Sequence, residues 1–348
     1  MAGPITELSS CVDALYLSGW APIPQDVRER LVRGRELAEA AGEPVPFRFG
    51  GQDFAIAARG LRKYPFCLKH EYGLILLNPT SGALPPVAVQ PRSAFLHAVG
   101  PLHAAEWFED TLAHHLGTVD LKVSRLDLHV DVQGWEMDAN ERDRFVCRPK
   151  ARATFEDDGR WTGFIFGHRR SGTVECRIYD KTAELKGILG IWEEVWGSAF
   201  DRSTPVIRVE FEVMRTCLRE FGLNTAADVV NASGAIWLYL TTQWLTYRDR
   251  TADETRSRWP LSPEWQAIQR ASLVSGAHGI ERMRSLQRRA TLQGLAPSLN
   301  GYLASFAAVV GTTGIEDTVA ALPLLLRQYG SHSGTSFEER VLKKASGA

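Results

Sequence analysis

The stretch ECRIYDKTAE, residues 175–184, concentrates reactive side chains around a single tyrosine. In a β-strand alternate side chains share a face, so Glu175, Arg177, Tyr179 and Lys181 are expected to lie together. A phenol needs nearby positive charge or a base before it can attack a substrate at neutral pH. A nucleophilic role for Tyr179 would make chemical sense of these residue types and their spacing.

Two other segments, SRLDLHVD and IRVEFEV, alternate charged and apolar residues in the same way. Each pattern predicts a strand with one charged face and one apolar face. The charged positions are Arg125, Asp127, His129, Asp131, Arg208, Glu210 and Glu212. If the three strands are neighbours in one sheet, acids, arginines, a lysine and a tyrosine converge on one patch.

Carboxylate oxygens without cysteine clusters are typical of sites for Mg²⁺ or Mn²⁺. The candidate ligands are Asp127, Glu210, Glu175 and Asp131. A metal-activated phosphodiester and a tyrosine nucleophile would make chemical sense of such a patch. The alternative is an antiparallel sheet with one solvated face, on which cross-strand Arg–Glu pairs are common. The recurrence of acids on three strands, with a tyrosine among them, favours a site.

The elements that would position these residues predict an α+β fold with an antiparallel sheet. The expected strands include residues 13–20, 122–132, 161–168, 173–181 and 206–215. The expected helices cover residues 27–42, 101–117 and about 182–196, and from about residue 225 the pattern is helical. We expect a sheet domain over residues 1–220 and a mainly helical region over residues 221–348.

Composition limits the class of protein. The chain has 348 residues, 44% of them hydrophobic, which is enough for a sizeable core. The five cysteines are far apart and form no CxxC pair, so neither a disulfide framework nor a thiolate zinc site is suggested. The net charge of −1 argues against a uniformly basic surface, so a nucleic-acid surface would have to be local. No long apolar run or basic leader occurs, and we expect a cytoplasmic protein with no membrane partner.

A family resemblance covers residues from about 60 to 215. GFIFGHRRSGTVECRIYDKTAE resembles the hairpin of the Rep_trans, or replication initiation factor, family of rolling-circle plasmids and mobile elements, in which a "YFGSR…RIYDK…E" pattern carries the nicking tyrosine. RLDLHVDV is similar to that family's "RIDLAVDF" strand, RSAFLHAVGP to its "RSEFLW…GP" segment, YPFCLKHEYGLILL to its early hairpin and VIRVEFEV to its "RVE" strand. The segments follow one another in the family's order.

The resemblance implies a nuclease sheet related to the HUH endonucleases but lacking their His-hydrophobe-His motif, and no His-x-His occurs in the sequence. It implies that Tyr179 attacks DNA that is single-stranded or extruded as a hairpin, becomes 5′-phosphotyrosyl-linked and leaves a free 3′-OH to prime synthesis. Asp127 and Glu210, with Glu175 or Asp131, would hold Mg²⁺ or Mn²⁺. Origin DNA, a host helicase and a second copy of the chain are the implied partners.

Each supporting residue has a simpler alternative role. Arg177 and Lys181 would offset charge on the transition state, but Arg177 could be only a cross-strand ion pair and Lys181 only an exposed partner of Glu184. Asp131 could be a turn residue at the end of its strand.

Two arginine clusters could contact phosphates, or could simply be solvated. They comprise Arg169 and Arg170 in the hairpin turn and Arg284, Arg288 and Arg289 in a C-terminal segment. The leading function is nicking and rejoining DNA to initiate rolling-circle replication. A conjugative relaxase of an integrative element and a catalytically silent DNA-binding protein of the same fold are the alternatives.

Overall fold

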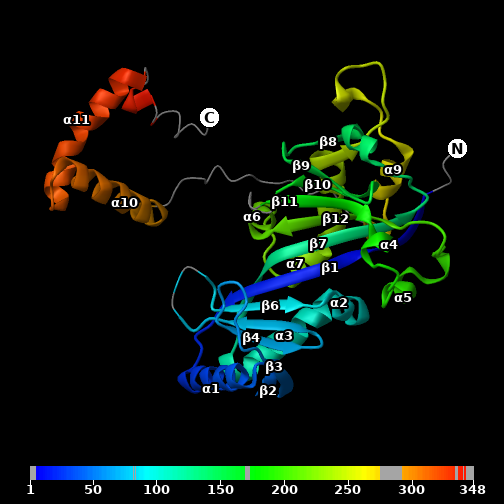
Figure 1. Cartoon of the computed structure of the whole chain (residues 1–348), viewed down its shortest axis with the longest axis horizontal. Helices are drawn as coiled ribbons and strands as arrows, with labels where there is room; N and C mark the ends of the chain where they lie inside the picture. Colours follow the sequence, from blue (N-terminus) through cyan, green and yellow to red (C-terminus); the bar gives the residue numbers. More distant parts are fainter. Residues whose placement is uncertain are drawn as a thin grey trace. The chain divides into compact units, whose positions relative to one another are not determined.

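The computed structural model describes residues 5–80, 82, 84–168, 173–274, 292–333, 336–339 and 341. Two compact units divide the chain, Met1–Arg282 and Met283–Ala348. The first unit combines helices with one large antiparallel sheet, so the expected α+β class is confirmed (Figure 1). The first unit extends beyond residue 220, the expected end of the sheet domain. The helices that follow residue 220 pack on the sheet and belong to the same unit.

Eleven strands form the sheet in the order β2-β3-β4-β5-β6-β1-β7-β12-β11-β10-β9. Every pair of neighbours is antiparallel. The strands are β1 (Thr6–Trp20), β2 (Val45–Phe49), β3 (Gln52–Ile56), β4 (Phe66–His70), β5 (Gly73–Leu77), β6 (Val87–Pro91), β7 (Asp120–Gln133), β9 (Arg152–Asp157), β10 (Arg160–Gly167), β11 (Val174–Asp180) and β12 (Ile207–Met214). A separate small sheet pairs β8 (Phe145–Cys147) with β13 (Leu245–Tyr247).

The helices of the first unit are mostly short. They are α1 (Gln25–Ala41), α2 (Ser93–Val99), α3 (Pro101–Leu116), α4 (Lys181–Glu184), α5 (Trp192–Trp196), α6 (Arg215–Glu220), α7 (Ala226–Asn231), α8 (Ser233–Tyr239) and α9 (Pro263–Gln269). The single helix expected over residues 182–196 is wrong, because Lys186, Gly187 and Gly190 take positive φ angles of 49°, 80° and 57° that interrupt it.

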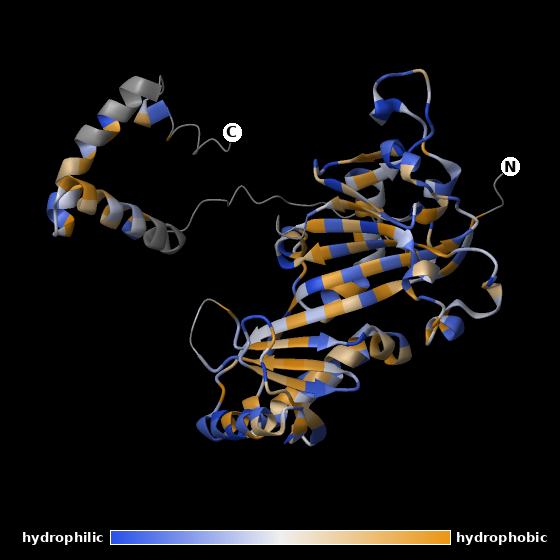
Figure 2. Cartoon of the chain, in the orientation of Figure 1, coloured by the Kyte–Doolittle hydropathy of each residue, from blue (hydrophilic) through white to orange (hydrophobic). Residues whose placement is uncertain are grey.

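One continuous core lies on the apolar face of the sheet, and the central strands alternate between hydrophobic and hydrophilic residues along their length (Figure 2). Leu126, Leu128 and Val130 of β7 are buried there. Phe211 of β12 packs edge-on against Trp237 of α8, with ring centroids 5.3 Å apart. Burying one such side chain stabilises the fold by roughly 1.5–3 kcal/mol, so this face fixes the register of the strands.

The described part of the second unit includes the helices α10 (Leu292–Val310) and α11 (Ile315–Ser333). The turn between them is held by Thr318, whose hydroxyl lies 2.7 Å from that of Thr312 and donates to the carbonyl of Gly314 at 2.6 Å. The helical pattern expected in this part of the sequence is confirmed for these residues. None of the helices in the described part of the chain has the length and hydrophobicity needed to cross a membrane.

Candidate active site on the charged sheet face

The register of β11, β12 and β7 brings the charged residues of the three segments onto one face, as the sequence predicts. Three rows cross these strands in that order: Glu175–Glu212–Asp127, Arg177–Glu210–His129 and Tyr179–Arg208–Asp131. β1 extends the rows with Ala14, Cys11 and Ser9. Residues paired across antiparallel strands point to the same side, so each row is a line of neighbouring side chains.

This face is not the solvated surface of the simpler interpretation. Five of its charged residues are buried, each with no more than 2% of the whole residue exposed: Asp127, Asp131, Arg208, Glu210 and Glu212. Burying a charge is costly unless it is paired and hydrogen-bonded. The chemistry available on this face therefore depends on which ion-pair and hydrogen-bond partner each buried charge has.

Three carboxylates and two guanidinium groups form the acid cluster, which we define as Asp127, Glu210 and Glu212 with Arg125 and Arg177. Arg125 donates from Nε to Asp127 Oδ1 at 2.7 Å, and its Nη2 lies 2.8 Å from Glu212 Oε2. Arg177 pairs with Glu210, and its Nη2 lies 3.9 Å from Asp127 Oδ2. Burial, and then the charges of Glu210 and Glu212, raise the pKa of Asp127 to about 7 against the influence of Arg125.

Tyr179 lies against this cluster. Its hydroxyl donates to Glu210 Oε2 at 3.0 Å. Burial, and next the charge of Glu210, raise the pKa of the Tyr179 phenol, while Arg208 and Arg177 act in the opposite direction. The phenol is therefore protonated at neutral pH, and Glu210 is in place to accept its proton.

Lys181 follows Tyr179 on the same side of the chain. Its ammonium group pairs with Glu184, as the simpler interpretation expects, but the side chain is buried rather than exposed. The Nζ atom lies 5.8 Å from the ring centre of Tyr179 and 5.0 Å from that of Trp192. Lys181 thus adds a positive charge beside the tyrosine.

Asp131 has a different environment from the acid cluster. It accepts two hydrogen bonds from Arg208, at 2.6 and 2.8 Å, one from Trp196 Nε1 at 2.7 Å and one from Ser9 Oγ at 3.1 Å. The turn-residue alternative is wrong, because Asp131 lies inside β7 and is fully buried. Four donors saturate this carboxylate, which favours a structural role over a metal ligand.

The sequence predicts no metal-binding or catalytic role for two members of the acid cluster. Glu212 and Arg125 lie on the predicted charged faces, two residues from Glu210 and Asp127. The period of two was the signal that could have included them. Glu175, which was included, lies at the end of the first row beside Glu212.

In the described residues the carboxylates of the acid cluster are paired with arginines and are not grouped as three metal ligands within 4.8 Å of one another. Among the described residues of the cluster, three carboxylates face two guanidinium groups, and burial first, with the charges of Glu210 and Glu212 added, raises the pKa of Asp127. Hard oxygen donors of this kind suit Mg²⁺ or Mn²⁺.

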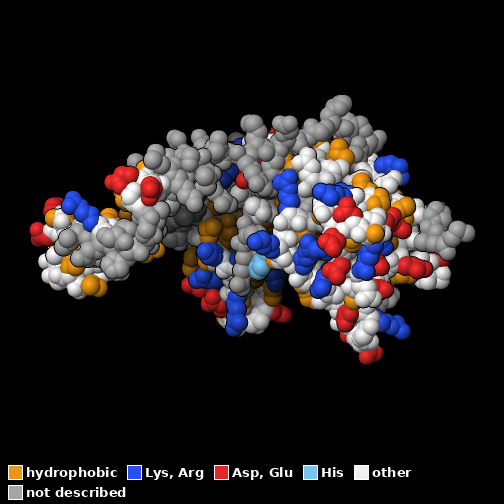
Figure 3. Space-filling model, turned by 90° about the horizontal axis from the view of Figure 1, so that it is seen from above, with side chains coloured by type: hydrophobic (Ala, Val, Ile, Leu, Met, Phe, Trp, Pro, Cys, Tyr) orange, Lys and Arg blue, Asp and Glu red, His pale blue; other side chains and the backbone are white. Residues whose placement is uncertain are grey.

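The candidate DNA-contacting arginines, Arg169, Arg170, Arg284, Arg288 and Arg289, lie outside the described residues. Lys and Arg side chains are intermixed with Asp and Glu on the coloured part of the surface (Figure 3). This mixture agrees with a net charge of −1.

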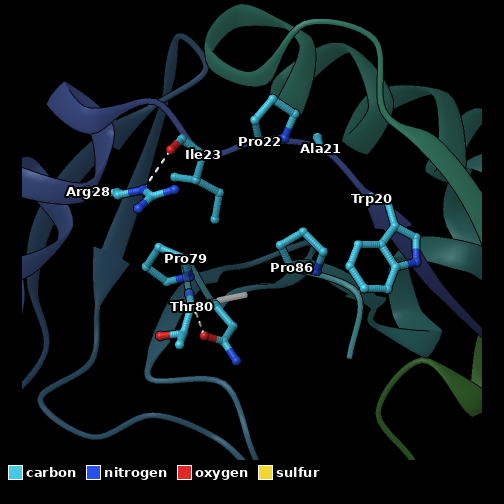
Figure 4. A pocket seen from close by; sticks show the side chains of 9 residues that line it. Trp20, Ala21, Pro22, Ile23, Arg28, Pro79, Thr80 and Pro86 are labelled. Carbon is cyan, nitrogen blue, oxygen red and sulfur yellow. Dashed lines mark hydrogen bonds between the residues drawn. The ribbon is translucent and has the colours of Figure 1, made fainter. Parts of the chain in front are cut away.

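A hollow of about 380 Å³ lies at the C-terminal end of β1 (Figure 4). It is lined by Trp20, Pro22, Ile23, Pro79 and Pro86 among others. Arg28 is the charged residue of its lining, and Arg28 Nε donates to the carbonyl of Ile23 at 2.7 Å. The lining carries no acid and no nucleophile of the kind found in the three rows. The rows, rather than this hollow, are the candidate active site.

Comparisons with known proteins give one structural likeness to report. No family model and no curated protein matches the sequence. A solved structure described as the rolling circle replication initiator protein from Geobacillus stearothermophilus has a TM-score of 0.44 and 16% identity, covering 75% of this chain and 95% of that chain. A likeness at that TM-score assigns no function to this chain.

Proposed function

We propose that the protein nicks and rejoins one strand of DNA through a phosphotyrosine intermediate and thereby initiates rolling-circle replication of a plasmid or mobile element. The observation that carries the proposal is the hydrogen bond from Tyr179 Oη to Glu210 Oε2 inside the acid cluster. The motif order resembling replication initiation factors supports the same chemistry. A phenol held against a carboxylate is arranged for nucleophilic attack.

In the proposed step, Tyr179 Oη forms a bond to the scissile phosphorus while its proton passes to Glu210. The bond from phosphorus to the 3′ oxygen breaks, and that oxygen takes a proton from solvent to become the free 3′-OH. The DNA 5′ phosphate remains attached to the tyrosine. Rejoining is the reverse reaction, in which Glu210 returns the proton to the phenol.

Positive charge near Tyr179 supports the attack. Arg177, whose side chain is 29% exposed, and the buried Lys181 would offset the charge that develops on the phosphoryl oxygens. A Mg²⁺ or Mn²⁺ ion held by Asp127, Glu210 and Glu212 would polarise the scissile phosphate.

The same geometry would serve a conjugative relaxase of an integrative element, which differs in its target DNA and its partners. A catalytically silent DNA-binding protein is disfavoured, because the phenol, its acceptor and the flanking cations are all in place. A host helicase and a second copy of the chain belong to the replication proposal as its further partners.

Duplex recognition is proposed to reside in the arginine clusters. Replacing Arg284, Arg288 and Arg289 together with alanine should weaken duplex binding and flatten its salt dependence by up to roughly 0.9 log units per lost phosphate contact. Cleavage of a short single strand carrying the nick site should survive. Normal duplex binding with an unchanged salt slope would assign recognition to another surface, such as the turn with Arg169 and Arg170.

The main experiment is nicking of a supercoiled plasmid that carries the DNA flanking the protein's own gene. Mg²⁺ or Mn²⁺ should support nicking, and EDTA should abolish it. Tyr179→Phe should retain DNA binding and lose nicking, because the ring still packs but no oxygen can attack. Tyr16→Phe is the matched control, since Tyr16 lies on the same face beside Arg125. Nicking by Tyr179→Phe at the wild-type rate would refute the proposal.

A further inference from the structure

Three residues distant in the sequence converge beside the candidate active site. Cys11 lies on β1, His129 lies opposite it on β7, and His97 comes from α2. One ligand atom from each residue lies within 4.8 Å of the others. We define these residues as the Cys–His cluster. The sequence pattern gave no sign of it, because the three residues share no motif.

The separations suit a shared ion. Cys11 Sγ lies 3.7 Å from His97 Nδ1 and 4.0 Å from His129 Nδ1. Tetrahedral Zn²⁺, with bonds of about 2.3 Å to sulfur and about 2.0–2.1 Å to nitrogen, holds such atoms about 3.5 Å apart. Small side-chain adjustments would bring all three atoms to bonding distance of one ion.

Outer contacts orient the histidines as metal ligands. His129 Nε2 lies 3.2 Å from Ser9 Oγ, which in turn donates to Asp131 Oδ2 at 3.1 Å. Cys11 Sγ lies 3.9 Å from Nε2 and 4.0 Å from Nδ1 of His129, and because Ser9 engages Nε2, Nδ1 is the nitrogen left for a metal ion. A ligating histidine usually has its second nitrogen held in this manner, which fixes the tautomer and the orientation of the ring.

The local charge favours a cation. Two carboxylates, Asp13 and Asp131, face one guanidinium, Arg208, which forms a bidentate pair with Asp131. Asp13 Oδ1 also lies 3.8 Å from His97 Nε2 and 3.9 Å from His129 Nδ1.

A covering side chain limits solvent at the cluster. The ring of Trp192 in α5 lies with its centre 5.0 Å from that of His97 and 5.8 Å from that of His129. The guanidinium carbon of Arg208 lies 4.1 Å from the same indole. An apolar shell of this kind strengthens the interaction between an ion and its ligands.

We propose that Cys11, His97 and His129 form a binding site for Zn²⁺ or a similar borderline-soft transition metal ion, with the fourth position taken by water or by Asp13. Binding replaces the thiol proton of Cys11 with the metal and releases that proton to solvent. The ion would join α2 to the sheet in the row that also contains Glu210. The sulfur and nitrogen ligands distinguish this site from the acid cluster, whose ligands would be carboxylate oxygens. The metal site does not depend on the proposed nicking activity.

Cobalt substitution tests the proposal directly on the full chain, without DNA. Protein stripped with a chelator and kept reduced should bind Co²⁺ at this site and show a thiolate-to-cobalt charge-transfer band, which carboxylate ligands cannot produce. Cys11→Ser should eliminate the band, and His97→Ala should weaken binding by at least about 100-fold, since loss of an outer-shell partner alone costs 10–100-fold. Cys147→Ser and the exposed His103→Ala are the matched controls, and both should bind like the wild type.

A second measurement uses the wild-type chain alone, in case a variant fails to fold. Zn²⁺ should slow alkylation of Cys11 relative to alkylation of Cys147, as read by peptide mass mapping. An absent charge-transfer band, a band that persists in Cys11→Ser, or alkylation of Cys11 at the same rate with and without Zn²⁺ would each overturn the proposal.

Discussion

The two halves of the large sheet use the face opposite the main core in different ways. Across β3 to β6 this face carries a small apolar cluster of Ala57, Cys67, Leu76 and Ala88. Across β1, β7, β12 and β11 the same face carries the three charged rows. An apolar cluster is stable wherever it is buried, whereas buried charges are stable only with specific partners.

The apolar cluster across β3 to β6 stabilises the fold, whereas the charged rows need a further explanation. A buried ion pair is often no more stabilising than a hydrophobic pair of similar volume. Retaining Asp127, Glu210 and Glu212 so close together therefore favours a functional reason for this half of the sheet.

The largest effect is expected when Glu210 loses its charge but keeps its volume. Glu210→Gln removes the acceptor for the Tyr179 proton, so the nicking rate should fall by about 10²–10⁴-fold. Single-turnover cleavage measures the rate, and thermal melting confirms that the variant is folded. Glu106→Gln, on the exposed surface of α3, should cleave normally. A folded Glu210→Gln enzyme with undiminished cleavage would remove Glu210 from the mechanism.

The next effect tests the cost of a buried charge. Arg208→Met leaves Asp131 without its bidentate partner and should lower the free energy of unfolding by about 3–5 kcal/mol in urea titrations. The exposed pair of Arg48 and Asp53 provides the control, because Arg48→Met should cost only about 0–1 kcal/mol.

Adding Asp131→Leu to Arg208→Met should restore most of the lost stability, because no charge then remains without its partner. If the double variant is as unstable as Arg208→Met alone, the loss comes from packing, and the contrast between the two halves weakens.

A smaller effect on the nicking rate is expected from a substitution in β10, the strand beside Tyr179. Gly163 of β10 pairs with Tyr179, and a Cβ atom at Gly163 would lie 3.0 Å from Tyr179 Cβ. Gly163→Ala should displace the tyrosine by a few tenths of an ångström and slow nicking by roughly tenfold, since catalysis is sensitive to such misplacement. Gly82→Ala, where a Cβ meets open space, should leave the rate unchanged. Equal rates for the two variants would show that the position of the phenol is not critical.

The smallest effect on stability is expected from Asp228, a carboxylate whose hydrogen bonds are made to backbone N–H groups at the start of α7. Asp228 accepts from the backbone N–H groups of Thr225 and Asn224 in the capping box of α7, and these bonds lower its pKa. A lowered pKa means that Asp228 stabilises the fold above its unfolded value near 3.9 and that this contribution is lost as the pH falls through the folded value.

Melting curves at several pH values test this expectation. Asp228→Asn should melt below the wild type at pH 7, and the two curves should converge as the pH falls below about 4. A difference that persists unchanged at low pH would mean that the charge of Asp228 contributes nothing to the cap.

The period of two in three sequence segments predicted the charged face, and the structure confirms that the strands lie side by side. Alternation could not show which partners each charge would find, because pairing depends on register across strands far apart in the sequence. Asp131 was therefore grouped with the metal ligands, although Arg208, Trp196 and Ser9 saturate it. The Cys–His cluster was missed for the same reason, since α2 and a bulge in β1 at Asp13 bring its members together.

Identification of the residue that becomes covalently linked to DNA tests directly whether Tyr179 is the nucleophile. Wild-type protein is incubated with nick-site DNA and Mg²⁺, the covalent adduct is digested, and the nucleotide-linked peptide is sequenced by mass spectrometry. We predict a 5′-phosphate ester on Tyr179. Attachment to another residue, such as Tyr16 on the same face, or cleavage without any covalent adduct, would contradict the assignment of Tyr179 as the nucleophile.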